Sequence, residues 1–424
     1  MANNNNTKNL NVPNLRFPEF KGEWRYSSLG RECDILCGYP FDGQAILEKS
    51  GNVKLLRGIN ITEGEIRHSD ELDRYYSGDI LKLKKYILCE GDLVLSMDGS
   101  KVGRNSAILT NLEDGAYLVQ RICRIRSQKH DVKYIFQHIN NSRFHQYVDS
   151  VKTASAIPHI SQSDIQNYII PFPPTHEEQI KITNLLSLLD EHIATQSKII
   201  EKYESLIKGI GNKLFSFKMR FKTNDGNDFP SWKTKSFENI GKTFSGLSGK
   251  AKEDFGIGKP YIQYKQVFDS PQIQIQNCGL VNVSDSENQN NVKYGDILFT
   301  VSSETPNEIG MSSVLLDEVD EMYLNSFCFG YRLSSFEVLS PLYASYFFRD
   351  SSFRNKVVKI AQGSTRYNIS KSELIKLEIS LPSIEEQARI ASFLSAVDEK
   401  IKNEKEILDL YLIQKSYLLR QMFI

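Results

Sequence analysis

The sequence lacks long hydrophobic runs, a cysteine framework and an excess of charge of either sign. No stretch approaches the ~18 consecutive apolar residues of a membrane-spanning helix, and the polar start MANNNNTKNLNVPNL has no apolar core like that of a signal peptide. Lys plus Arg total 52 and Asp plus Glu total 52. The net charge therefore does not point to a polyanionic partner, although a local basic face can still bind one. We expect a cytoplasmic protein.

Motifs of catalysis and metal binding are also missing. The six cysteines have neither a disulfide-framework nor a zinc spacing. Cys33 and Cys37 are four apart, but no second pair completes a metal site. The chain has no G-x-x-x-x-G-K-[ST] phosphate loop, no H-E-x-x-H and no G-x-S-x-G, and its seven histidines do not cluster. We predict no catalytic residue, no metal ligand and no cofactor in this chain.

The chain does contain an internal repeat, which is the first feature to seek in a long sequence. Pro174–Ile193 (PTHEEQIKITNLLSLLDEHI) and Pro382–Ile401 (PSIEEQARIASFLSAVDEKI) match at ten of twenty positions, with an offset of 208. Average residue usage would give about one match. Four more blocks recur in the same order: Phe17-Pro18 and Phe229-Pro230, EGDLVLSM and YGDILFTV, SRFHQYV and SSFRNKV, HISQSDI and NISKSEL. We infer a duplicated unit of about half the chain.

Both units have the same predicted order of secondary structure. Short runs with period two, such as YILCEGDLVLS and VKYGDILFTVS, indicate strands separated by turns. An aromatic-rich helical segment follows, and then a short apolar strand that leads to proline. We predict an α/β (α+β) chain with two similar β-rich modules.

A long helix closes each unit. Thr175 and Ser383 stand at N-cap positions with Glu178 and Glu386 three residues later, which predicts a capping box in each copy. Beyond the caps, apolar positions step by three and four, the heptad spacing of paired helices. The predicted seam consists of Ile182, Leu186, Leu189, Ile193, Gln196, Ile200, Tyr203, Ile207, Ile210 and Leu214, and of Ile390, Leu394, Val397, Ile401, Glu404, Leu408, Tyr411, Lys415, Leu418 and Met422.

The seam predicts that the two helices pair with each other. Each helix would run ~40 residues, or ~60 Å at 1.5 Å per residue. Gln196 and Glu404 are polar residues at the same seam position, where a polar side chain can fix the register of a pair. Gly209 and Gly211 have no counterpart in the second helix, so we expect unequal helix ends and a bend in the first helix.

Positive charge is concentrated in equivalent segments. Val119–Lys152 holds seven Lys or Arg against two Asp, Arg349–Lys371 holds six against one Asp, and Lys198–Lys222 holds seven against two Glu. A solvated helix face explains any one of these. Equivalent basic segments in both halves favour surfaces that position phosphates.

Loops beside these segments differ between the halves although their flanks keep register. DGSKVGR stands where the second half has SETPNEIG, and Ala156–His159 stands where it has Thr365–Asn368. Neutral drift of surface loops explains this divergence, but so does a scaffold whose two copies read different DNA bases. On the second interpretation the DNA-binding candidates are Ser100, Lys101, Arg104, Lys152, Thr153, Ser155 and His159 in the first half, and Ser302, Ser303, Ser364, Thr365, Arg366, Tyr367 and Asn368 in the second.

These motifs together resemble a known family. Two half-chain units that each end in P-[ST]-x-E-E-Q-x-x-I and a heptad helix, with LRFPEFKGEW near the start, Gly-Asp strands and an Ile-Ser block before each helix, resemble the specificity (S) subunit of type I restriction-modification systems. The resemblance covers nearly the whole chain. The paired EEQ helices at this spacing are its most specific part.

The resemblance implies two target recognition domains, at 1–174 and 219–382, separated by a central spacer helix at 175–218 and a C-terminal one at 383–424. The helices would pair as an antiparallel coiled coil, which relates the domains by an approximate two-fold axis. Each domain would read one half of a bipartite double-stranded DNA site, and the helices would set the unread gap and dock two methyltransferase subunits. The helix residues that we assign to partner binding are Glu177, Glu178, Gln179, Glu385, Glu386 and Gln387.

The resemblance also places the chemistry in other subunits. The methyltransferase subunits would bind S-adenosylmethionine, and restriction subunits would use ATP and Mg²⁺, so this chain would be non-catalytic alone. A standalone DNA methyltransferase or nuclease is an alternative, against which the missing G-x-G cofactor loop and Asn/Asp-Pro-Pro-aromatic tetrapeptide argue. A coiled-coil scaffold without a DNA role is the other alternative.

Overall fold

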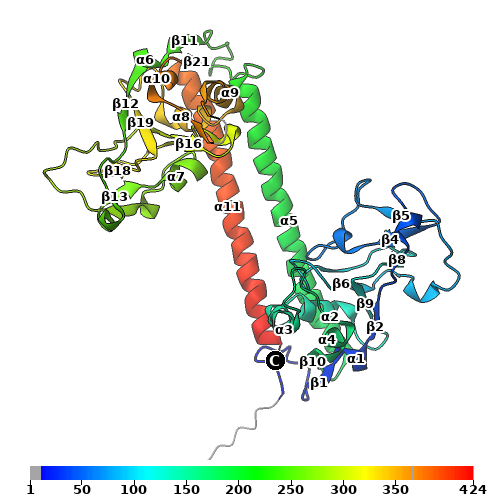
Figure 1. Cartoon of the computed structure of the whole chain (residues 1–424). Helices are drawn as coiled ribbons and strands as arrows, with labels where there is room; N and C mark the ends of the chain where they lie inside the picture. Colours follow the sequence, from blue (N-terminus) through cyan, green and yellow to red (C-terminus); the bar gives the residue numbers. More distant parts are fainter. Residues whose placement is uncertain (1–10, 364–365, 424) are drawn as a thin grey trace, which may run out of the picture. The chain divides into compact units, whose positions relative to one another are not determined.

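The chain divides into two compact units, and each unit takes half of both long helices. The computed structural model describes residues 11–363 and 366–423. Unit 1 comprises Met1–Gln196 and Ile407–Ile424, and unit 2 comprises Ser197–Glu406 (Figure 1). The structure thus groups each half-helix with the β-rich module beside it, whereas the predicted boundaries at 174/175, 218/219 and 382/383 separate helices from modules.

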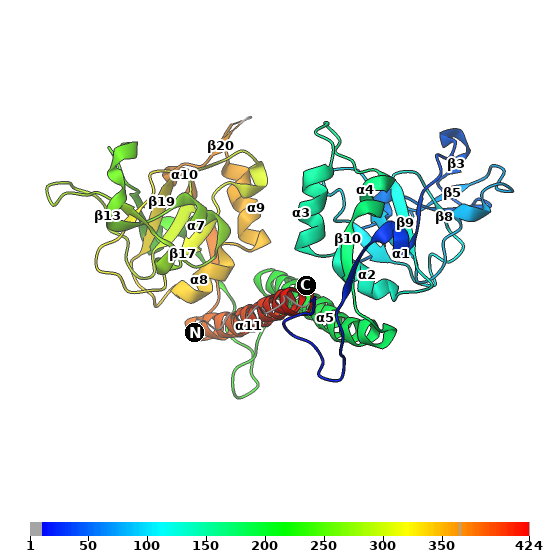
Figure 2. The ribbon, with the colours of Figure 1, turned by 90° about the horizontal axis from the view of Figure 1, so that it is seen from below.

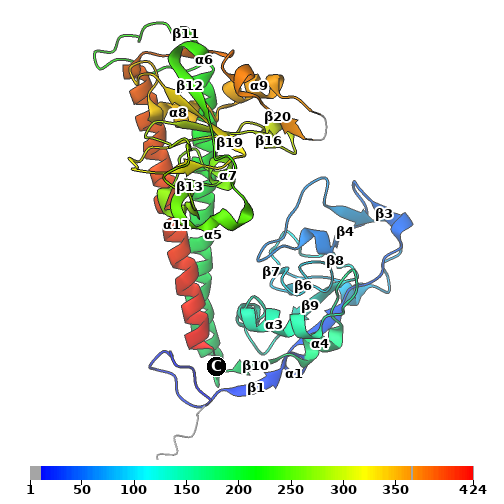
Figure 3. The same cartoon turned by 60° about the vertical axis from the view of Figure 1, so that its left-hand side comes forward.

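Unit 1 contains two four-stranded sheets and one two-stranded pairing. The strand orders are β2-β9-β6-β7, β3-β5-β4-β8 and β1-β10, and Figure 3 shows β7, β6 and β9 side by side. The strands are β1 (Arg25–Ser28), β2 (Asp34–Cys37), β3 (Ile46–Leu47), β4 (Val53–Leu56), β5 (Arg74–Tyr76), β6 (Leu93–Ser96), β7 (Ser106–Ile108), β8 (Tyr117–Leu118), β9 (Ile122–Arg126) and β10 (Ile169–Phe172). The helices are α1 (Leu29–Glu32), α2 (Val132–Ile139), α3 (Ser142–Val151), α4 (Gln162–Asn167) and the first half of α5 (His176–Phe215).

Unit 2 repeats this topology. Its sheet β12-β19-β15-β17 corresponds to β2-β9-β6-β7, its pair β11-β21 corresponds to β1-β10, and β13 runs parallel to β18 as β4 does to β8. The strands are β11 (Lys233–Ser236), β12 (Gly241–Ser245), β13 (Phe255–Ile262), β14 (Gly279–Val281), β15 (Ile297–Thr300), β16 (Ser302–Ser303), β17 (Ser312–Val314), β18 (Tyr323–Leu324), β19 (Cys328–Leu333), β20 (Tyr367–Asn368) and β21 (Glu378–Leu381). The helices are α6 (Phe237–Ile240), α7 (Tyr264–Asp269), α8 (Pro341–Phe347), α9 (Ser351–Ile360), α10 (Lys371–Leu374) and α11 (Ile384–Met422). The predicted duplication is confirmed.

The repeated Gly-Asp sequence is explained by the turn that precedes the central strand of each unit. Gly91 and Gly295 have φ of +84° and +83°, a conformation that suits glycine because it has no Cβ. Asp92 accepts a hydrogen bond from the Cys89 amide and two from the Arg126 guanidinium at 2.6 and 2.7 Å. In unit 2, Asp296 accepts from the Lys293 amide and from Arg332 in the same way. The motif therefore closes the turn and fixes the neighbouring strand.

The two glycines predict different mutational costs. Gly91→Ala is expected to lower the free energy of unfolding by about 1–2 kcal/mol, because a Cβ is strained at positive φ and nothing else lies within 4 Å. Gly295→Ala is expected to cost more, because its Cβ would lie 2.4 Å from Phe336 Cζ and 3.2 Å from Pro341 Cγ. Urea denaturation of both variants checks the order, and equal losses would contradict it.

The predicted helix seam is confirmed, and every one of its residues is buried or half-buried. In unit 1, Ile182 and Leu186 near the start of α5 share a core cluster with Met422 at the end of α11, as Figure 2 shows for the two ribbons. In unit 2, Leu214 near the end of α5 packs with Leu394 near the start of α11. Opposite ends meet in both units, so the helices run antiparallel.

The glycine pair does not shorten or interrupt the first helix. α5 runs through Gly209 and Gly211 to Phe215 and has 40 residues, against 39 in α11. The expectation of unequal helix ends is therefore wrong. Leu214 and Phe215 are buried in the core of unit 2, and this packing outweighs the low helix propensity of glycine, which costs about 1 kcal/mol per residue.

Each predicted capping box makes only one of its two hydrogen bonds, because the glutamate carboxylate bonds to other residues. The Glu178 amide donates to Thr175 Oγ1 and the Glu386 amide donates to Ser383 Oγ, both at 3.3 Å. The Glu178 carboxylate instead accepts from Arg16 Nε and Nη2 at 2.7 and 2.8 Å and from Trp24 Nε1 at 3.2 Å. This fully buried carboxylate ties the N-terminal segment to the helix.

The equivalent clamp in unit 2 has the same three residue types. Glu386 accepts from Arg220 Nε and Nη2 at 3.0 and 2.7 Å and from Trp232 Nε1 at 3.2 Å. Arg220 also donates to the carbonyls of Phe229 and Pro230, as Arg16 donates to those of Lys21 and Gly22. Arg16 therefore corresponds to Arg220, and in this contact Lys21-Gly22 takes the place of Phe229-Pro230. The rings of Phe17 and Phe229 nevertheless make the same contact, with the cation at the matching position of the following helix: Lys181 lies 4.7 Å and Arg389 lies 5.8 Å from the ring centroid. The predicted match of the two phenylalanines agrees with this contact.

The assignment of the EEQ residues to partner binding needs correction for four of the six. Glu178, Gln179, Glu386 and Gln387 are 0 to 2% exposed and bond within their own units. Gln179 accepts from the Asp131 amide, and Gln387 accepts from the Ser340 amide. Buried side chains with these partners cannot contact another subunit. Glu177 and Glu385 are exposed, and their assignment stays a prediction.

Candidate nucleic-acid interface

In unit 1, the two predicted reading loops lie side by side. The loop after β6 and the loop after α3 form an antiparallel bridge between Asp98 and His159. The Gly99 amide donates to the Pro158 carbonyl at 3.1 Å, and the Ile160 amide donates to the Met97 carbonyl at 2.9 Å. Backbone hydrogen bonds between residues 59 and 63 positions apart in sequence therefore bring the two candidate loops together.

In unit 2, the equivalent loops form a short sheet. β16 pairs with β20 through Ser302 with Asn368 and Ser303 with Tyr367. The Arg366 guanidinium donates to Ser302 Oγ at 3.1 Å. Ser302 and Ser303 are buried, with 6 and 8% of their surface exposed, so they support the loop more than they face solvent. The candidates Ser364 and Thr365 lie outside the described residues.

The same backbone bonds recur at matching positions, whereas the side chains differ. Ile369 donates to the Val301 carbonyl as Ile160 does to that of Met97. The bridge between Asp98 and His159 corresponds to the pair of Ser302 and Asn368. Each unit therefore holds its candidate loops with the same backbone hydrogen bonds, which we call the framework, while the side chains on it differ between the units.

A residue at the start of the adjacent strand completes each framework. The Met97 amide donates to the Arg121 carbonyl at 2.9 Å, and the Val301 amide donates to the Phe327 carbonyl at 3.0 Å. Arg121 and Phe327 are both exposed. Neither residue is among the candidates predicted from the sequence, although alignment of the two strands as repeats sets Arg121 opposite Phe327 as a further diverged pair.

A third loop, also missed, follows β4 in unit 1 and β13 in unit 2. The Arg57 amide donates to Asn60 Oδ1 at 3.2 Å, and the Gln263 amide donates to Gln266 Oε1 at 3.1 Å, so this turn is also built twice. Within it, Gly58 in unit 1 corresponds to Tyr264 in unit 2, whose hydroxyl donates to the Ser302 carbonyl at 2.8 Å. The sequence does not reveal this turn as a repeat, because the side chain that accepts the hydrogen bond is Asn60 in unit 1 and Gln266 in unit 2.

A hollow opens beside each framework. The hollow of unit 1 has a volume of 430 Å³ and is lined by Cys37, Met97, Asp98, Arg121, Ile157, His159 and Ile160. The hollow of unit 2 has a volume of 330 Å³ and is lined by Tyr264, Phe268, Ser302, Ser303, Glu304, Glu308 and Arg366. The first lining combines aliphatic and sulfur-bearing side chains with Asp98, Arg121 and His159, and the second combines aromatic and acidic side chains with Arg366. The hollow of unit 2 includes Tyr264 of the third loop, whereas that of unit 1 includes Arg121, so the two hollows occupy only partly matching positions of the repeat.

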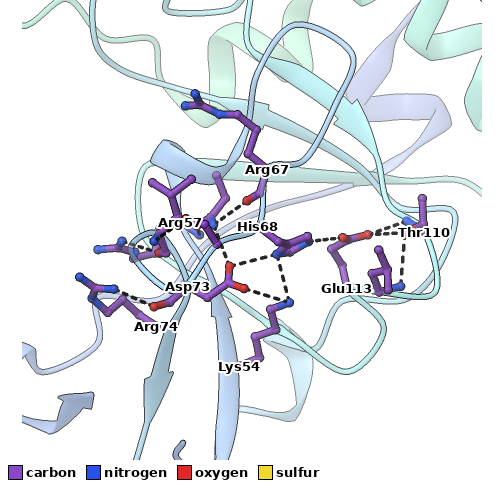
Figure 4. A network of polar contacts seen from close by, with 12 residues as sticks. Lys54, Arg57, Arg67, His68, Asp73, Arg74, Thr110 and Glu113 are labelled. Carbon is purple, nitrogen blue, oxygen red and sulfur yellow. Dashed lines mark hydrogen bonds and ion pairs between the residues drawn. The ribbon is translucent and has the colours of Figure 1, made fainter. Parts of the chain in front are cut away.

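Under the unit 1 surface, a polar network holds the third loop to the sheet. His68 Nδ1 lies 3.0 Å from Asp73 Oδ1, and His68 Nε2 lies 2.5 Å from Glu113 Oε1 (Figure 4). Asn60 Nδ2 donates to Asp73 at 3.2 Å. Although burial opposes it, hydrogen bonds from His68 and Thr110 hold the pKa of Glu113 below its usual range. In Figure 4 the exposed Arg67 side chain points away from this network.

The predicted basic residues of unit 1 are partly neutralised. Arg104 and Lys152 both donate to Asp149 at 2.7 Å. The hydrogen bonds from Lys152 and Arg104 lower the pKa of Asp149 to about 2. Lys101 donates to Glu63 at 3.0 Å. Because these pairs are exposed, they contribute little to stability, and a phosphate can replace the carboxylate as the partner of each cation.

Two arginines of the second basic segment are structural, which corrects the phosphate-positioning interpretation there. Arg349 donates to four backbone carbonyls, among them that of Ser312 at 2.6 Å, and Arg354 donates to the carbonyl of Gly310 at 2.7 Å. Burial lowers the pKa of each to about 10. Counting charges along the sequence could not separate these buried arginines from exposed Arg366.

A metal-binding cluster is not found in the part of the chain that the structure describes. There, no group of three His, Cys, Asp or Glu side chains is placed to hold a metal ion. Among the same residues, none of the helices combines the length and the hydropathy that a membrane crossing requires.

Comparison with known proteins identifies the family. The model of the type I restriction modification DNA specificity domain matches residues 21–205 and again 215–410. Two curated relatives come from Methanocaldococcus jannaschii. The type I restriction enzyme MjaVIII specificity subunit is 25% identical over 76% of each chain. The putative type I restriction enzyme MjaX specificity subunit is 26% identical over 82% of this chain and 83% of the relative. The Escherichia coli EcoBI specificity subunit is 19% identical over 95% of this chain and 87% of its own.

Solved structures share the fold along nearly the whole chain. The S subunit of a type I restriction-modification system from M. genitalium has a TM-score of 0.58 at 15% identity and covers 97% of this chain and 99% of its own. A chain from a study of complex assembly and conformational transition of a type I restriction-modification system has a TM-score of 0.53 at 16% identity, over 95% and 97%. With two family matches that together span most of its length, this chain belongs to the family of type I restriction modification DNA specificity proteins.

Proposed function

We propose that each unit reads one half of a bipartite double-stranded DNA site. One observation supports this proposal. Three loops in each unit are held together by the same backbone hydrogen bonds, but their exposed side chains differ between the units. Neutral drift of surface loops also produces divergence. Here the loops keep their backbone hydrogen bonds, while Arg121 and His159 in unit 1 and Arg366 and Asn368 in unit 2 carry side chains that can bond to base edges.

The chemistry would belong to other subunits. Among the described residues, no group of three His, Cys, Asp or Glu side chains is placed to hold a metal ion, and the relatives are specificity subunits by name. We therefore expect two methyltransferase subunits to supply S-adenosylmethionine chemistry and restriction subunits to supply ATP- and Mg²⁺-dependent steps. Since the substrate would be DNA, we expect the complex to act in the cytoplasm. DNA methylation by the purified chain alone would instead support a standalone enzyme.

A partner surface is available on the outer face of α11 in unit 1. Ile407, Leu410, Ile413 and Tyr417 are spaced by three and four, so they form a stripe on one face of the helix. They are 38, 65, 63 and 53% exposed. The seam residues Leu408 and Tyr411 face the other way and are half-buried. We propose that this stripe, defined by these four residues, docks a methyltransferase subunit.

Arg366→Ala is expected to relax recognition of one half-site only. Arg366 belongs to unit 2 and lines its hollow, so losing it should remove about 1–3 kcal/mol of discrimination at one base pair. Methylation of DNA substrates altered in each half measures the effect, and the half read by unit 1 serves as the internal control. Equal loss on both halves, or no loss on either, would contradict the proposal.

A scaffold without a DNA role predicts no salt-dependent DNA binding, even with a methyltransferase subunit present.

A further inference from the structure

Arg121 is held in an unusual pose at the rim of the unit 1 hollow. It precedes β9 and has φ of +68°, a conformation that non-glycine residues adopt only when their surroundings require it. Its carbonyl is fixed by the Met97 amide. Its guanidinium donates to Asp98 Oδ2 at 2.7 Å, yet 63% of the side chain remains exposed. The backbone is therefore constrained while most of the charged group faces outward.

Stability alone does not account for this arrangement. An exposed ion pair contributes about 0–1 kcal/mol, and a strained backbone conformation costs about as much or more. The pair does not close a core, because it lines an open hollow together with Met97 and Ile160. The arrangement instead holds a cation, Arg121, and an anion, Asp98, side by side in a fixed geometry at the surface of the loops.

We propose that Arg121, oriented by Asp98, is a specificity-determining residue that reads a G·C base pair in the half-site of unit 1. This inference rests on the proposed function. Arg donates two parallel hydrogen bonds to O6 and N7 of guanine, and a carboxylate accepts from the N4 amino group of cytosine. The Arg121 and Asp98 side chains are thus complementary to the two major-groove edges of one pair. A·T in its place would set the adenine N6 amino group against the guanidinium and the thymine O4 against the carboxylate.

The surroundings sharpen the discrimination. The aliphatic and sulfur-bearing lining of the hollow leaves few groups that could bond to a mismatched base, so an unpaired donor or acceptor stays unsatisfied. His159 is the other polar residue of the lining, and its Nδ1 lies 3.0 Å from Thr153 Oγ1. Among the described residues that line the hollow, Arg121 and Asp98 are the two that carry a full charge.

Unit 2 lacks this pair at the matching position. Phe327 takes the place of Arg121 and is 59% exposed, and Ser302 takes the place of Asp98. A phenyl ring offers apolar contact to a base but no hydrogen bond. The requirement for G·C at this framework position should accordingly belong to the half-site of unit 1.

The test uses the full chain, tagged and recovered from its host with the subunits that copurify. The complex is incubated with random duplex DNA, and the selected sequences are compared with the adenine-methylated motif of the host genome. Wild type should select a split motif with one G·C pair in the half assigned to unit 1. Arg121→Gln should lower the preference for that pair by about 5- to 150-fold, equivalent to 1–3 kcal/mol, and leave the other half unchanged. Lys82→Ala, an exposed lysine elsewhere in unit 1, is the control.

Two further variants keep the inference falsifiable if Arg121→Gln melts at a lower temperature. Asp98→Asn retains Arg121 and should weaken the preference at the same pair. Ser302→Asp with Phe327→Arg rebuilds the pair in unit 2 and should add a G·C preference to the second half. Unchanged preference in all three variants would overturn the inference, as would equal loss of binding to every sequence, which marks a phosphate contact. Absence of any split motif in wild type would instead overturn the proposed function.

Discussion

Replacing Glu178 with alanine is expected to lower the free energy of unfolding of unit 1 by about 3–5 kcal/mol. The carboxylate is fully buried and accepts from Arg16, which is 14% exposed, and from Trp24, which is 1% exposed. Without it, the guanidinium and the indole N–H lose their acceptor in a place that water hardly reaches. Glu386→Ala should cost less, because its partner Arg220 is 29% exposed and can be hydrated.

Tryptophan fluorescence measures this effect directly. The chain has two tryptophans, and each donates to one of the two glutamates. In a Trp232→Phe background, urea denaturation followed by fluorescence reports on Trp24 and hence on unit 1. Glu177→Ala is the matched control, because Glu177 is the exposed neighbour of Glu178 and should change stability by less than about 0.5 kcal/mol. If Glu178→Ala lowered the free energy of unfolding no more than Glu177→Ala does, the clamp would not be holding the module to the helix.

The repeat made the fold predictable because its physical causes are local. Heptad steps, the hydroxyl caps at Thr175 and Ser383, and the Gly-Asp turns act over a few residues, and each appears twice. The clamp of Arg16, Trp24 and Glu178 was not predictable, because it joins residues up to 162 positions apart. Its glutamate resembled an exposed capping residue in the sequence. In the structure Glu178 is buried and not exposed. Gln179, which was predicted to bind a partner, is also buried and contacts the core of its own unit.

The reading loops were predictable only in part, for a related reason. Divergence between flanking anchors located the loops that contain Asp98 and His159, and the structure joins them. Arg121 was missed because it lies next to a strand whose other arginines, Arg124 and Arg126, bond to Asp34 and Asp92 within the unit. Sequence alone does not tell an exposed arginine such as Arg121 from a buried one such as Arg124, three residues later. The positive φ of Arg121, visible only in the structure, separates them.

The second large effect is expected at the stripe on α11. Leu410→Asp together with Ile413→Asp should reduce binding of the methyltransferase subunit by more than about 30-fold, since burying two unpaired carboxylates in an interface costs more than a single hot-spot contact of about 2 kcal/mol. Both residues are more than 60% exposed in this chain. Copurification of the subunit with the tagged chain, and methylation of the host genome, measure the loss.

Folding and docking can be separated at this helix because its two faces have different roles. The seam face holds unit 1 together through Met422 and Leu418, and the stripe contacts nothing in that core, so the double variant should melt at the wild-type temperature. Ser416→Asp is the control for added charge, because this exposed residue lies beside the stripe, roughly 100° around the helix from Tyr417 and roughly 60° from Ile413. It adds one negative charge where the double variant adds two. Normal copurification of the double variant would place the partner surface elsewhere. Loss with Ser416→Asp as well would show that charge on α11, and not the apolar stripe, governs docking.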